Sequence, residues 1–246
     1  MDVNSEASFE QPASRAAFLK ELFGIYRPVE TLSEDENKSV ILAQHKELKK
    51  SVVIRSDGKH RPIYELLAAV RHPNLPEICD VYYFDDGEIV IREYVRGISL
   101  AQALQTGLFK YAGAKKIIGQ LCAALSFLHQ NGWVHRDIKP ENVLISDDGV
   151  AMLIDFDAAR RFDGCKSGDT EALGTVGYAP PEQFGISQSD FRSDIYALGV
   201  LLNVMLTGTH PSDRLADGKA AKIVRRCTQI NPSARFQTVG ELQKKL

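Results

Sequence analysis

The hydrophobic residues of this chain follow two different periods, and the change between them divides the chain into two parts. From Tyr26 to about Val95, short apolar runs alternate with polar turns, as is typical of strands. The turn Asp85-Asp86-Gly87 favours a hairpin between two of these runs. After Gly97 the apolar residues recur at helical spacing instead. The sequence therefore predicts a sheet followed by a set of helices. The predicted strand runs are 40–43, 52–54, 81–84 and 89–91.

Several helices can be placed from the same pattern. Near the N-terminus, Ser14 can cap a short helix that ends at Gly24, and residues 63–70 form a second short helix among the strands. Residues 194–207 are apolar nearly all round, which indicates a helix buried in the middle of its lobe. Residues 116–130 predict an amphipathic helix. Its apolar face consists of Ile118, Leu121, Leu125 and Leu128.

This order of elements predicts an α+β protein of two lobes, with a hinge near Tyr94 to Gly97 and a cleft between the lobes. We expect residues 1–25 to form an N-terminal extension with a short helix. Residues 26–95 should then form the strand-rich lobe and residues 96–246 the helical lobe. The helical lobe is abbreviated, because only one helix, roughly 219–227, fits between Gly199 and Arg235.

Composition narrows the function classes. The 246 residues carry a formal net charge of −2, which gives no electrostatic reason to expect a nucleic-acid partner. The four cysteines form no CxxC pair, which argues against a zinc site and favours a reducing cytoplasm. The N-terminus has no signal-peptide pattern, and the longest apolar stretch, near 195–206, is too short to span a bilayer. We therefore expect a cytoplasmic protein without a membrane span, and nothing in the sequence indicates its oligomeric state.

One short motif carries most of the chemistry. The stretch HRDIKPEN (135–142) is followed by LIDFDAAR (153–160), GTVGYAPPE (174–182) and SDIYALG (193–199). Together these motifs resemble the eukaryotic-type (Hanks-type) Ser/Thr protein kinase family, and the resemblance runs from about residue 26 to 246. It implies a protein-kinase-like fold with a small antiparallel β N-lobe and a mainly helical C-lobe, in a minimal, bacterial-looking member.

The resemblance implies transfer of the γ-phosphate of ATP to Ser/Thr hydroxyls of a protein substrate. Asp137 would orient the acceptor hydroxyl, and Lys139 would offset charge on the transferred phosphate. Asn142 and Asp155 would supply oxygen ligands to Mg²⁺, with Mn²⁺ as an alternative. Thr175 matches the residue that hydrogen-bonds Asp137 and Lys139 in Ser/Thr-specific members. The alternative is that these are ordinary solvated loop residues, but this does not explain why all of them occur at the positions of the family motifs.

Further matching positions imply structural and regulatory roles. His135 and Phe156 resemble members of the family's internal hydrophobic stack. Asp194 resembles the acid that braces the catalytic loop. The remaining matches are the buried ion pair of Glu182 with Arg235, and a regulatory set in which phosphorylated Ser167 or Thr170 would be received by Arg136.

The N-lobe departs from the family pattern at the phosphates. Ser33, Asp35 and Lys38 stand where the glycine loop has its three glycines, so close backbone approach to a triphosphate is lost. Arg55 replaces the usual third-strand lysine, and Arg is not equivalent to Lys at a phosphate. Lys38 occupies the position from which with-no-lysine kinases supply their anchoring lysine. The alternative is that Lys38 is a solvated turn residue.

Three more departures from the family pattern are expected at the cleft. Glu65 is the nearest acid to the position from which a helix glutamate normally pairs with the strand cation, and an exposed helix acid is the alternative. Arg92 occupies the gatekeeper position, where a charge requires a partner such as Glu65 or Asp155. Asp157 replaces the glycine of the metal-binding motif.

The remaining ATP contacts follow from the resemblance. Adenine would lie between Val40 and Val53 above and Leu144 below. It would bind the hinge backbone at Glu93 and Val95.

Two alternatives to catalysis stay open. The acidic lid and the substituted residues Arg55, Arg92 and Asp157 favour a pseudokinase, which would use the same fold for nucleotide sensing or as a scaffold. A small-molecule phosphotransferase is the second alternative. Lys139 and the GTVGYAPPE segment argue against it, because they shape a groove for a polypeptide hydroxyl.

Overall fold

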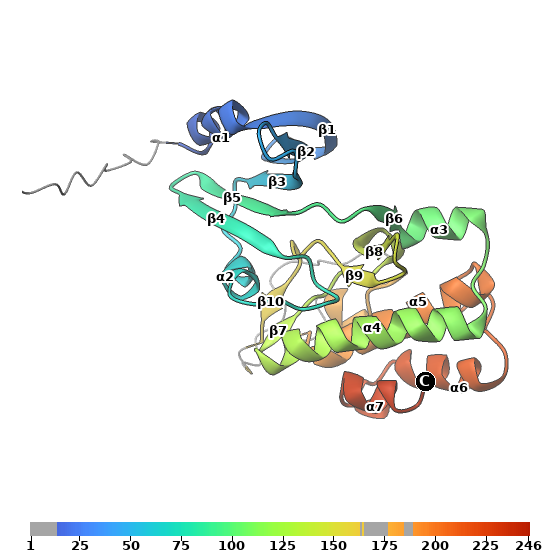
Figure 1. Ribbon diagram of the computed structural model, residues 1–246. Helices are drawn as coiled ribbons and strands as arrows, with labels where there is room; N and C mark the ends of the chain where they lie inside the picture. Colours follow the sequence, from blue (N-terminus) through green and yellow to red (C-terminus); the bar gives the residue numbers. More distant parts are fainter. Residues whose placement is uncertain (1–13, 163, 165–176, 185–188) are drawn as a thin grey trace, which may run out of the picture. The chain divides into compact units, whose positions relative to one another are not determined.

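The computed structural model describes residues 14–162, 164, 177–184 and 189–246 (Figure 1). The chain divides into two compact units. The first unit comprises Met1–Val70 and Glu77–Tyr94, and the second comprises Arg71–Pro76 and Val95–Leu246. The division falls at the start of the predicted hinge, and the short segment Arg71–Pro76 belongs to the second unit rather than the first.

The first unit is built on one antiparallel sheet with the strand order β1-β2-β3-β5-β4. The hairpin expected at Asp85-Asp86 is present, because β4 and β5 pair up to Phe84 opposite Gly87. Gly87 is needed there, since its φ is +134° and a Cβ atom would lie 2.1 Å from the Asp57 carbonyl oxygen. The strands are β1 (Tyr26–Glu34), β2 (Lys38–His45), β3 (Ser51–Asp57), β4 (Ile78–Phe84) and β5 (Gly87–Glu93).

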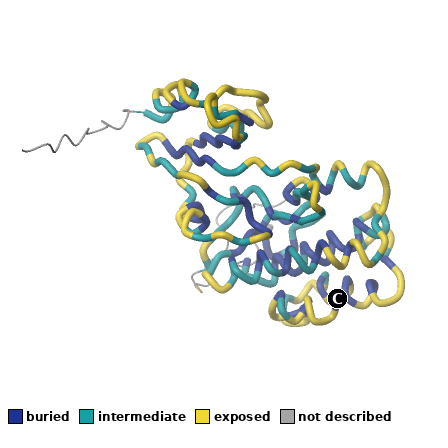
Figure 2. The backbone as a smooth tube through the Cα atoms, viewed as in Figure 1, coloured by how far each residue is buried: buried dark blue, intermediate teal, exposed yellow. Residues whose placement is uncertain are grey.

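The register of the sheet places three cationic side chains, those of Lys38, Arg55 and Arg92, on one face. Lys38 lies opposite Asp57, and Val40 lies opposite Arg55. Side chains alternate between the two faces along a strand, so residues two apart on one strand share a face with each other and with their partners on the next strand. In Figure 2 the edge strand β1 is mostly yellow, whereas β3 and β5 are largely dark blue. The residues on this face that were predicted to surround the nucleotide are Lys38, Val40, Val53, Arg55 and Arg92.

The opposite face of the sheet is covered by α1 (Arg15–Ile25). Ser14 caps this helix as predicted, since its hydroxyl accepts a hydrogen bond from Ala17 N at 3.3 Å, and the helix continues one residue past Gly24. Residues 14–25 of the predicted extension therefore contribute to the first unit's core. Leu22 is buried against a row of apolar side chains from the strands, namely Ala43, Val52, Ile54, Ile89 and Ile91.

One short helix lies between β3 and β4, as predicted. This is α2 (Ile63–Ala68), which ends two residues before the predicted boundary. Ile63, Tyr64 and Leu67 are buried, and α2 contacts β4. Glu65, the one charged residue of α2, is exposed.

The second unit is mainly helical. The predicted helix at 116–130 begins five residues earlier, and two helices, α3 and α7, were missed. Short strands around the loops form two small sheets, β6-β8-β9 and β10-β7. The helices are α3 (Leu100–Thr106), α4 (Tyr111–Gln130), α5 (Phe191–Thr207), α6 (Gly218–Cys227) and α7 (Val239–Gln243), with the 3₁₀ turns η1 (Pro140–Asn142), η2 (Pro181–Phe184) and η3 (Pro232–Ala234). The strands are β6 (Gly97–Ser99), β7 (Trp133–Val134), β8 (Val143–Ser146), β9 (Ala151–Leu153) and β10 (Arg160–Arg161).

The core of the second unit is formed around α5, which contacts both α4 and α6. The apolar face predicted for α4 is fully buried, and α5 is buried on most sides, as its composition predicted. Gly199 permits the close approach of α5 to α6, because a Cβ atom at this position would lie 2.3 Å from Cys227 Cβ. The predicted two-part α+β fold with an abbreviated helical part is thus confirmed. None of the helices within the described ranges combines the length and apolar character needed to cross a membrane.

The segment Arg71–Pro76 is bound tightly within the second unit. Asn74 donates from Nδ2 to Ala151 O at 2.9 Å, and Asn74 O accepts from Leu153 N at 2.9 Å. The ring of His72 lies 5.8 Å from that of Phe127 on α4. Six residues that follow α2 in sequence therefore complete the packing of α4 and β9.

Candidate functional site

Three of the predicted catalytic residues meet in the loop between β7 and β8. Lys139 Nζ lies 2.8 Å from Asp137 Oδ2. Asn142 donates from Nδ2 both to the same carboxylate oxygen and to Asp137 O, each at 2.8 Å. The side chain of Asp137 retains 18% exposure, so a substrate hydroxyl can reach it. A carboxylate, an ammonium group and an amide are thus brought together within six residues of chain.

The predicted metal ligands lie beside this group. Ile154 N donates to Asn142 O at 2.9 Å, which holds Asp155 next to Asn142. Both hydrogen bonds of the Asn142 side chain use Nδ2, so its amide presents Oδ1 as a metal ligand. The described residues contain no cluster of three His, Cys, Asp or Glu side chains suited to a metal. An Asp and an Asn nevertheless fit Mg²⁺, which commonly takes one or two protein ligands and completes its shell with phosphates and water.

A buried carboxylate fixes the backbone just before Asp137. Asp194, near the start of α5, accepts hydrogen bonds from His135 N at 3.0 Å and Arg136 N at 2.8 Å. His129 Nε2 lies 2.8 Å from the same carboxylate. Burial by itself would raise the pKa of Asp194, but the hydrogen bond and charge of His129 and the amide of His135 hold it below its ordinary value. Asp194 therefore braces the loop as a carboxylate, as predicted.

The ring of His135 belongs to the predicted internal stack. It lies edge-on to the ring of Phe156, with the ring centres 5.4 Å apart, and both residues are buried. His135 Nδ1 accepts a hydrogen bond from Asp137 N at 3.3 Å, so we assign the ring proton to Nε2. Burial lowers the pKa of His135, although the charges of nearby carboxylates oppose this effect.

The predicted ion pair of Glu182 with Arg235 is confirmed. Arg235 donates from Nη1 and Nη2 to the two carboxylate oxygens of Glu182, at 2.6 and 2.9 Å. The guanidinium is fully buried and also donates to the carbonyl oxygens of Gln229, Arg192 and Ile230. This network anchors η2, which contains Glu182, to the C-terminal part of the second unit.

In the first unit, the side chain of Arg55 is bound within the sheet. Arg55 Nη1 donates to Glu88 Oε1 at 3.0 Å, and its Nη2 pairs with Asp57. Arg61 N donates to Glu88 Oε2 at 2.8 Å, and the Tyr64 ring centre lies 5.2 Å from the guanidinium carbon of Arg55. Burial raises the pKa of Glu88, against the effects of Arg61 and Arg55. Sequence analysis did not find Glu88 and Asp57 as partners of Arg55.

The turn that replaces the glycine loop is closed by a side chain. Asp35 Oδ1 accepts hydrogen bonds from Asn37 N at 3.1 Å and Lys38 N at 2.9 Å, and Asp35 N donates to Lys38 O at 2.8 Å. At the N-terminus of α1, Arg15 donates to Asn37 O at 3.0 Å. No residue from Ser33 to Lys38 has a positive φ, which explains why this turn requires no glycine.

The other N-lobe candidates have different surroundings. Glu65 is exposed on α2, and burial, followed by the charges of Glu65 and Glu88, raises the pKa of Tyr83 to about 12. Arg92 donates to Glu93 O at 3.2 Å. The backbone of Glu93, which was expected to bind adenine, therefore accepts a hydrogen bond from the gatekeeper at its carbonyl oxygen.

The remaining predicted residues divide between the two units or lie outside the described residues. Val40 and Val53 belong to the sheet of the first unit, whereas Val95 and Leu144 belong to the second. Leu144 lies on β8 opposite Ser99 and Met152. The predicted regulatory hydroxyls and the predicted partner of Asp137 lie outside the described residues; they are Ser167, Thr170 and Thr175.

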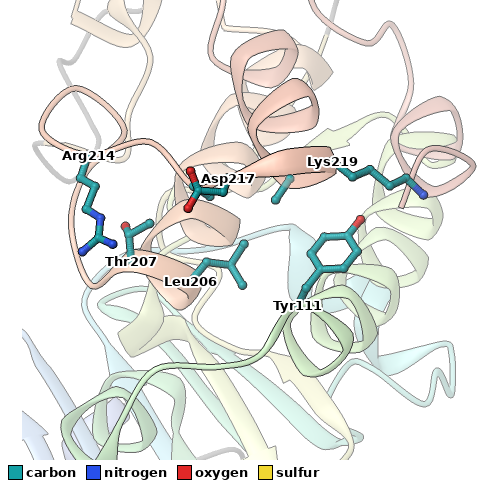
Figure 3. Close-up of a pocket in the computed structure, with 8 residues that line it drawn as sticks. Tyr111, Leu206, Thr207, Arg214, Asp217 and Lys219 are labelled. Atoms are coloured by element: carbon teal, nitrogen blue, oxygen red, sulfur yellow. The ribbon is translucent and has the colours of Figure 1, made fainter.

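A surface pocket of about 330 Å³ lies elsewhere in the second unit (Figure 3). Tyr111 at the start of α4 and Leu206 near the end of α5 contribute to it. The catalytic loop follows the opposite end of α4, and a helix of 20 residues is about 30 Å long. This pocket is therefore distant from the residues that carry the chemistry.

Comparison with known proteins agrees with the geometry. The family model described as "Protein kinase domain" matches residues 29–245. A probable serine/threonine-protein kinase PknB of Lactococcus lactis is 36% identical over 169 residues, which cover 68% of this chain and 27% of that protein. The serine/threonine-protein kinases PknB of Mycolicibacterium smegmatis and Mycobacterium tuberculosis are 31% and 33% identical over 79% and 75% of this chain. The matches cover 37% and 32% of those two proteins, so the chain spans well under half the length of these relatives.

The buried imidazole generates a prediction about acid stability. Because the native pKa of His135 is lowered, the unfolded chain takes up a proton below about pH 6.5 while the native ring stays neutral. Stability should therefore fall as the pH drops from 7.5 to 5, by up to about 1.4 kcal/mol per pH unit from this residue. His135→Phe should make the pH dependence of the unfolding free energy less steep in denaturant titrations. The lost hydrogen bond from Asp137 N lowers stability equally at each pH, so an unchanged slope would contradict the assignment.

Proposed function

The chain belongs to the protein kinase family, and on that premise we propose that it transfers the γ-phosphate of ATP to Ser/Thr hydroxyls of a protein substrate. The observation that carries this proposal is the cluster of Asp137, Lys139 and Asn142, with Asp155 held beside it. Phosphoryl transfer needs positioned groups and charge stabilisation more than covalent participation, and this cluster offers both.

Each residue of the cluster has a distinct role in the proposal. Asp137 accepts the hydrogen bond of the substrate hydroxyl and orients its oxygen toward the phosphorus atom. Lys139, already 2.8 Å from that carboxylate, offsets the negative charge of the transferred group. Asn142 and Asp155 hold a divalent cation, which we propose to be Mg²⁺, with Mn²⁺ as an alternative; bound there, it neutralises phosphate charge. The resemblance adds Thr175 as a partner of Asp137 and favours Ser/Thr acceptors.

On the side of the first unit, we propose Lys38 as the cation that contacts the phosphates. Two buried carboxylates bind the Arg55 guanidinium, so its charge is already compensated within the sheet. Lys38 lies on the same face of the sheet, next to the turn that replaces the glycine loop. Its compact ammonium group suits a phosphate, whereas the planar Arg head suits the carboxylates it binds here. Val40, Val53 and Leu144 would enclose adenine, with the backbone of Glu93 and Val95 as its hydrogen-bonding partners.

A pseudokinase is the second candidate, and two observations favour it. Arg55 is held by Glu88 and Asp57, and the lid turn carries an aspartate in place of glycine. A protein that binds nucleotide without transferring phosphate would tolerate both features. Purified protein with Mg²⁺ and labelled ATP, followed by mapping of phosphorylated residues, distinguishes the two. Nucleotide binding without any transfer to protein hydroxyls would support the pseudokinase.

Asp137→Asn tests the catalytic assignment. The change keeps the shape of the side chain but removes the carboxylate that orients the hydroxyl, so we expect turnover to fall by about 10²–10⁴-fold with nucleotide binding unchanged. Peptide phosphorylation and binding of a fluorescent ATP analogue measure the two properties. Asp148→Asn, at an exposed turn of the same unit, is the control. Autophosphorylation of Asp137→Asn at the parent's rate would show that the assignment is wrong.

Lys38→Met and Arg55→Met together identify the phosphate-binding cation. We expect Lys38→Met to lower kcat/KM for ATP at least tenfold, about 1.4 kcal/mol of transition-state stabilisation. Arg55→Met should act mainly on stability, by about 3–5 kcal/mol, because it removes the cation that binds Glu88 and leaves Asp57 with the more distant Arg61, at 3.7 Å. Turnover per folded molecule should change less.

Kinetics and denaturant titrations on both variants and on Lys50→Met, an exposed lysine of the same unit, provide the comparison. If Arg55→Met abolishes turnover while remaining folded and Lys38→Met is near neutral, Arg55 is the anchor and Lys38 is not.

The resemblance also motivates a proposal about control. We expect phosphorylation of Ser167 or Thr170 to raise activity severalfold, because Arg136 can receive a phosphate through charge-assisted hydrogen bonds. The measurement compares phosphatase-treated and untreated enzyme, and repeats the comparison with the Ser167→Ala/Thr170→Ala variant. Equal activity of treated and untreated parent enzyme would contradict the proposal.

A further inference from the structure

The residue before Asp137 has an unfavourable backbone conformation. Arg136 has a φ of +69°, in the left-handed region that residues with a Cβ atom rarely occupy. Such a conformation costs on the order of 1–3 kcal/mol and persists only where the surrounding structure enforces it. Because Asp137 follows directly, the direction of its carboxylate depends on how firmly the backbone of Arg136 is held.

The amide side of Arg136 is held by α5. Asp194 accepts the hydrogen bond of Arg136 N at 2.8 Å and that of His135 N at 3.0 Å. This contact fixes the peptide that enters Arg136. It leaves rotation about the Cα–C bond of Arg136 to be fixed by another group, and that rotation sets the orientation of the peptide leading into Asp137.

The carbonyl side of Arg136 is held by a second, separate residue. Gln183 donates from Nε2 to Arg136 O at 2.8 Å, and only 1% of Gln183 is exposed. The amide is close to its acceptor and shielded from water, so its loss would leave a buried carbonyl without this donor. Arg136 is thus bound at its N–H by a helix and at its C=O by a 3₁₀ turn that lies 47 residues away in sequence.

The 3₁₀ turn is itself rigidly placed. Gln183 directly follows Glu182, whose two carboxylate oxygens bind the buried guanidinium of Arg235 at 2.6 and 2.9 Å. Gln183 N also donates to Pro180 O at 3.0 Å, which closes the turn. Two neighbouring residues of η2 therefore bind different parts of the unit. The side chain of Glu182 binds Arg235, and the side chain of Gln183 binds the catalytic loop.

We propose that Gln183 is a positioning residue for phosphoryl transfer, which acts by fixing the Arg136 carbonyl and hence the direction of the Asp137 carboxylate. The inference rests on the proposed role of Asp137. A glutamine suits the task because its amide is a neutral donor, whereas a carboxylate would repel the carbonyl oxygen. Misplacing a reacting group by about 1 Å can cost about 10²-fold in rate, so one buried hydrogen bond can have a large effect on turnover.

Gln183→Met is the first test, because it removes the donor at similar length. We expect kcat for a peptide substrate to fall at least tenfold per folded molecule, while KM for ATP and binding of an ATP analogue change less than twofold. Gln229→Met is the matched control, since Gln229 Nε2 also donates to a backbone carbonyl, that of Arg225, at 2.8 Å but on an exposed surface. It should leave kcat unchanged.

A second variant tests the donor itself and covers the case in which Gln183→Met does not fold. Gln183→Glu keeps the shape but places a carboxylate against Arg136 O, and burial raises the pKa of such a group. Once protonated, it can donate to the carbonyl again. We therefore expect its kcat, as a ratio to the parent at the same pH, to be low at pH 8 and to rise at least threefold by pH 6.

A third variant separates a positioning role of Gln183 from a general loss of stability. Leu202→Ala, which truncates a fully buried side chain of α5, should lower the denaturant midpoint of unfolding without changing kcat per folded molecule. An equal loss of kcat in Leu202→Ala and Gln183→Met would overturn the inference, as would parent-like kcat in Gln183→Met. A flat ratio for Gln183→Glu between pH 8 and 6 would also count against it. If Asp137→Asn retains activity, the proposed function fails instead, whatever Gln183 does.

Discussion

The geometry of the catalytic loop depends on one buried carboxylate, that of Asp194. A carboxylate without access to water is stable only when hydrogen-bond donors surround it, and here the donors are two backbone amides of the loop and the ring of His129. The same contacts that stabilise the charge also hold the loop. Because α5 is packed on most sides, the carboxylate cannot move to follow the loop, and the loop must adapt to it. The left-handed backbone of Arg136 is the result of that adaptation.

The first unit solves a similar electrostatic problem differently. Its strand cation, Arg55, is compensated by carboxylates from its own strand and from the adjacent β5 rather than by an acid on a helix. A helix of six residues offers few positions for such an acid, and Glu65 is turned to solvent and to Tyr83. The sheet therefore supplies rigidity that a longer helix would otherwise provide. The turn between β1 and β2 is likewise held by side chains: hydrogen bonds to Asp35 stabilise a conformation that does not need glycine.

The sequence predicted best where the relevant residues are close together in the chain. Asp137, Lys139 and Asn142 span six residues, so their motif determines their proximity once the loop exists. The apolar face of α4 was equally clear, because its period is local. Glu88 was not foreseen as a partner of Arg55, because it lies 33 residues away and only the register of β3 with β5 brings the two together. Asp57 lies two residues from Arg55 on the same strand and was also missed, although side chains two apart on a strand share a face. Gln183 directly follows a recognised motif, but nothing in its neighbours indicates that its amide reaches Arg136.

The segment Arg71–Pro76 affects the order in which the parts of the chain can fold. It is synthesised before β4 and β5, but its hydrogen-bonding partners belong to the second unit. Asn74 binds Ala151, which lies 77 positions later in the chain. During translation, the backbone groups of Asn74 and its side chain must remain without these partners until β9 has emerged. The two units therefore cannot be separated by a single cut in the sequence, and the first unit is interrupted by a piece that belongs elsewhere. Contacts between residues this far apart in the sequence form late in folding. We therefore expect the packing of Arg71–Pro76 against α4 and β9 to form after the sheet of the first unit.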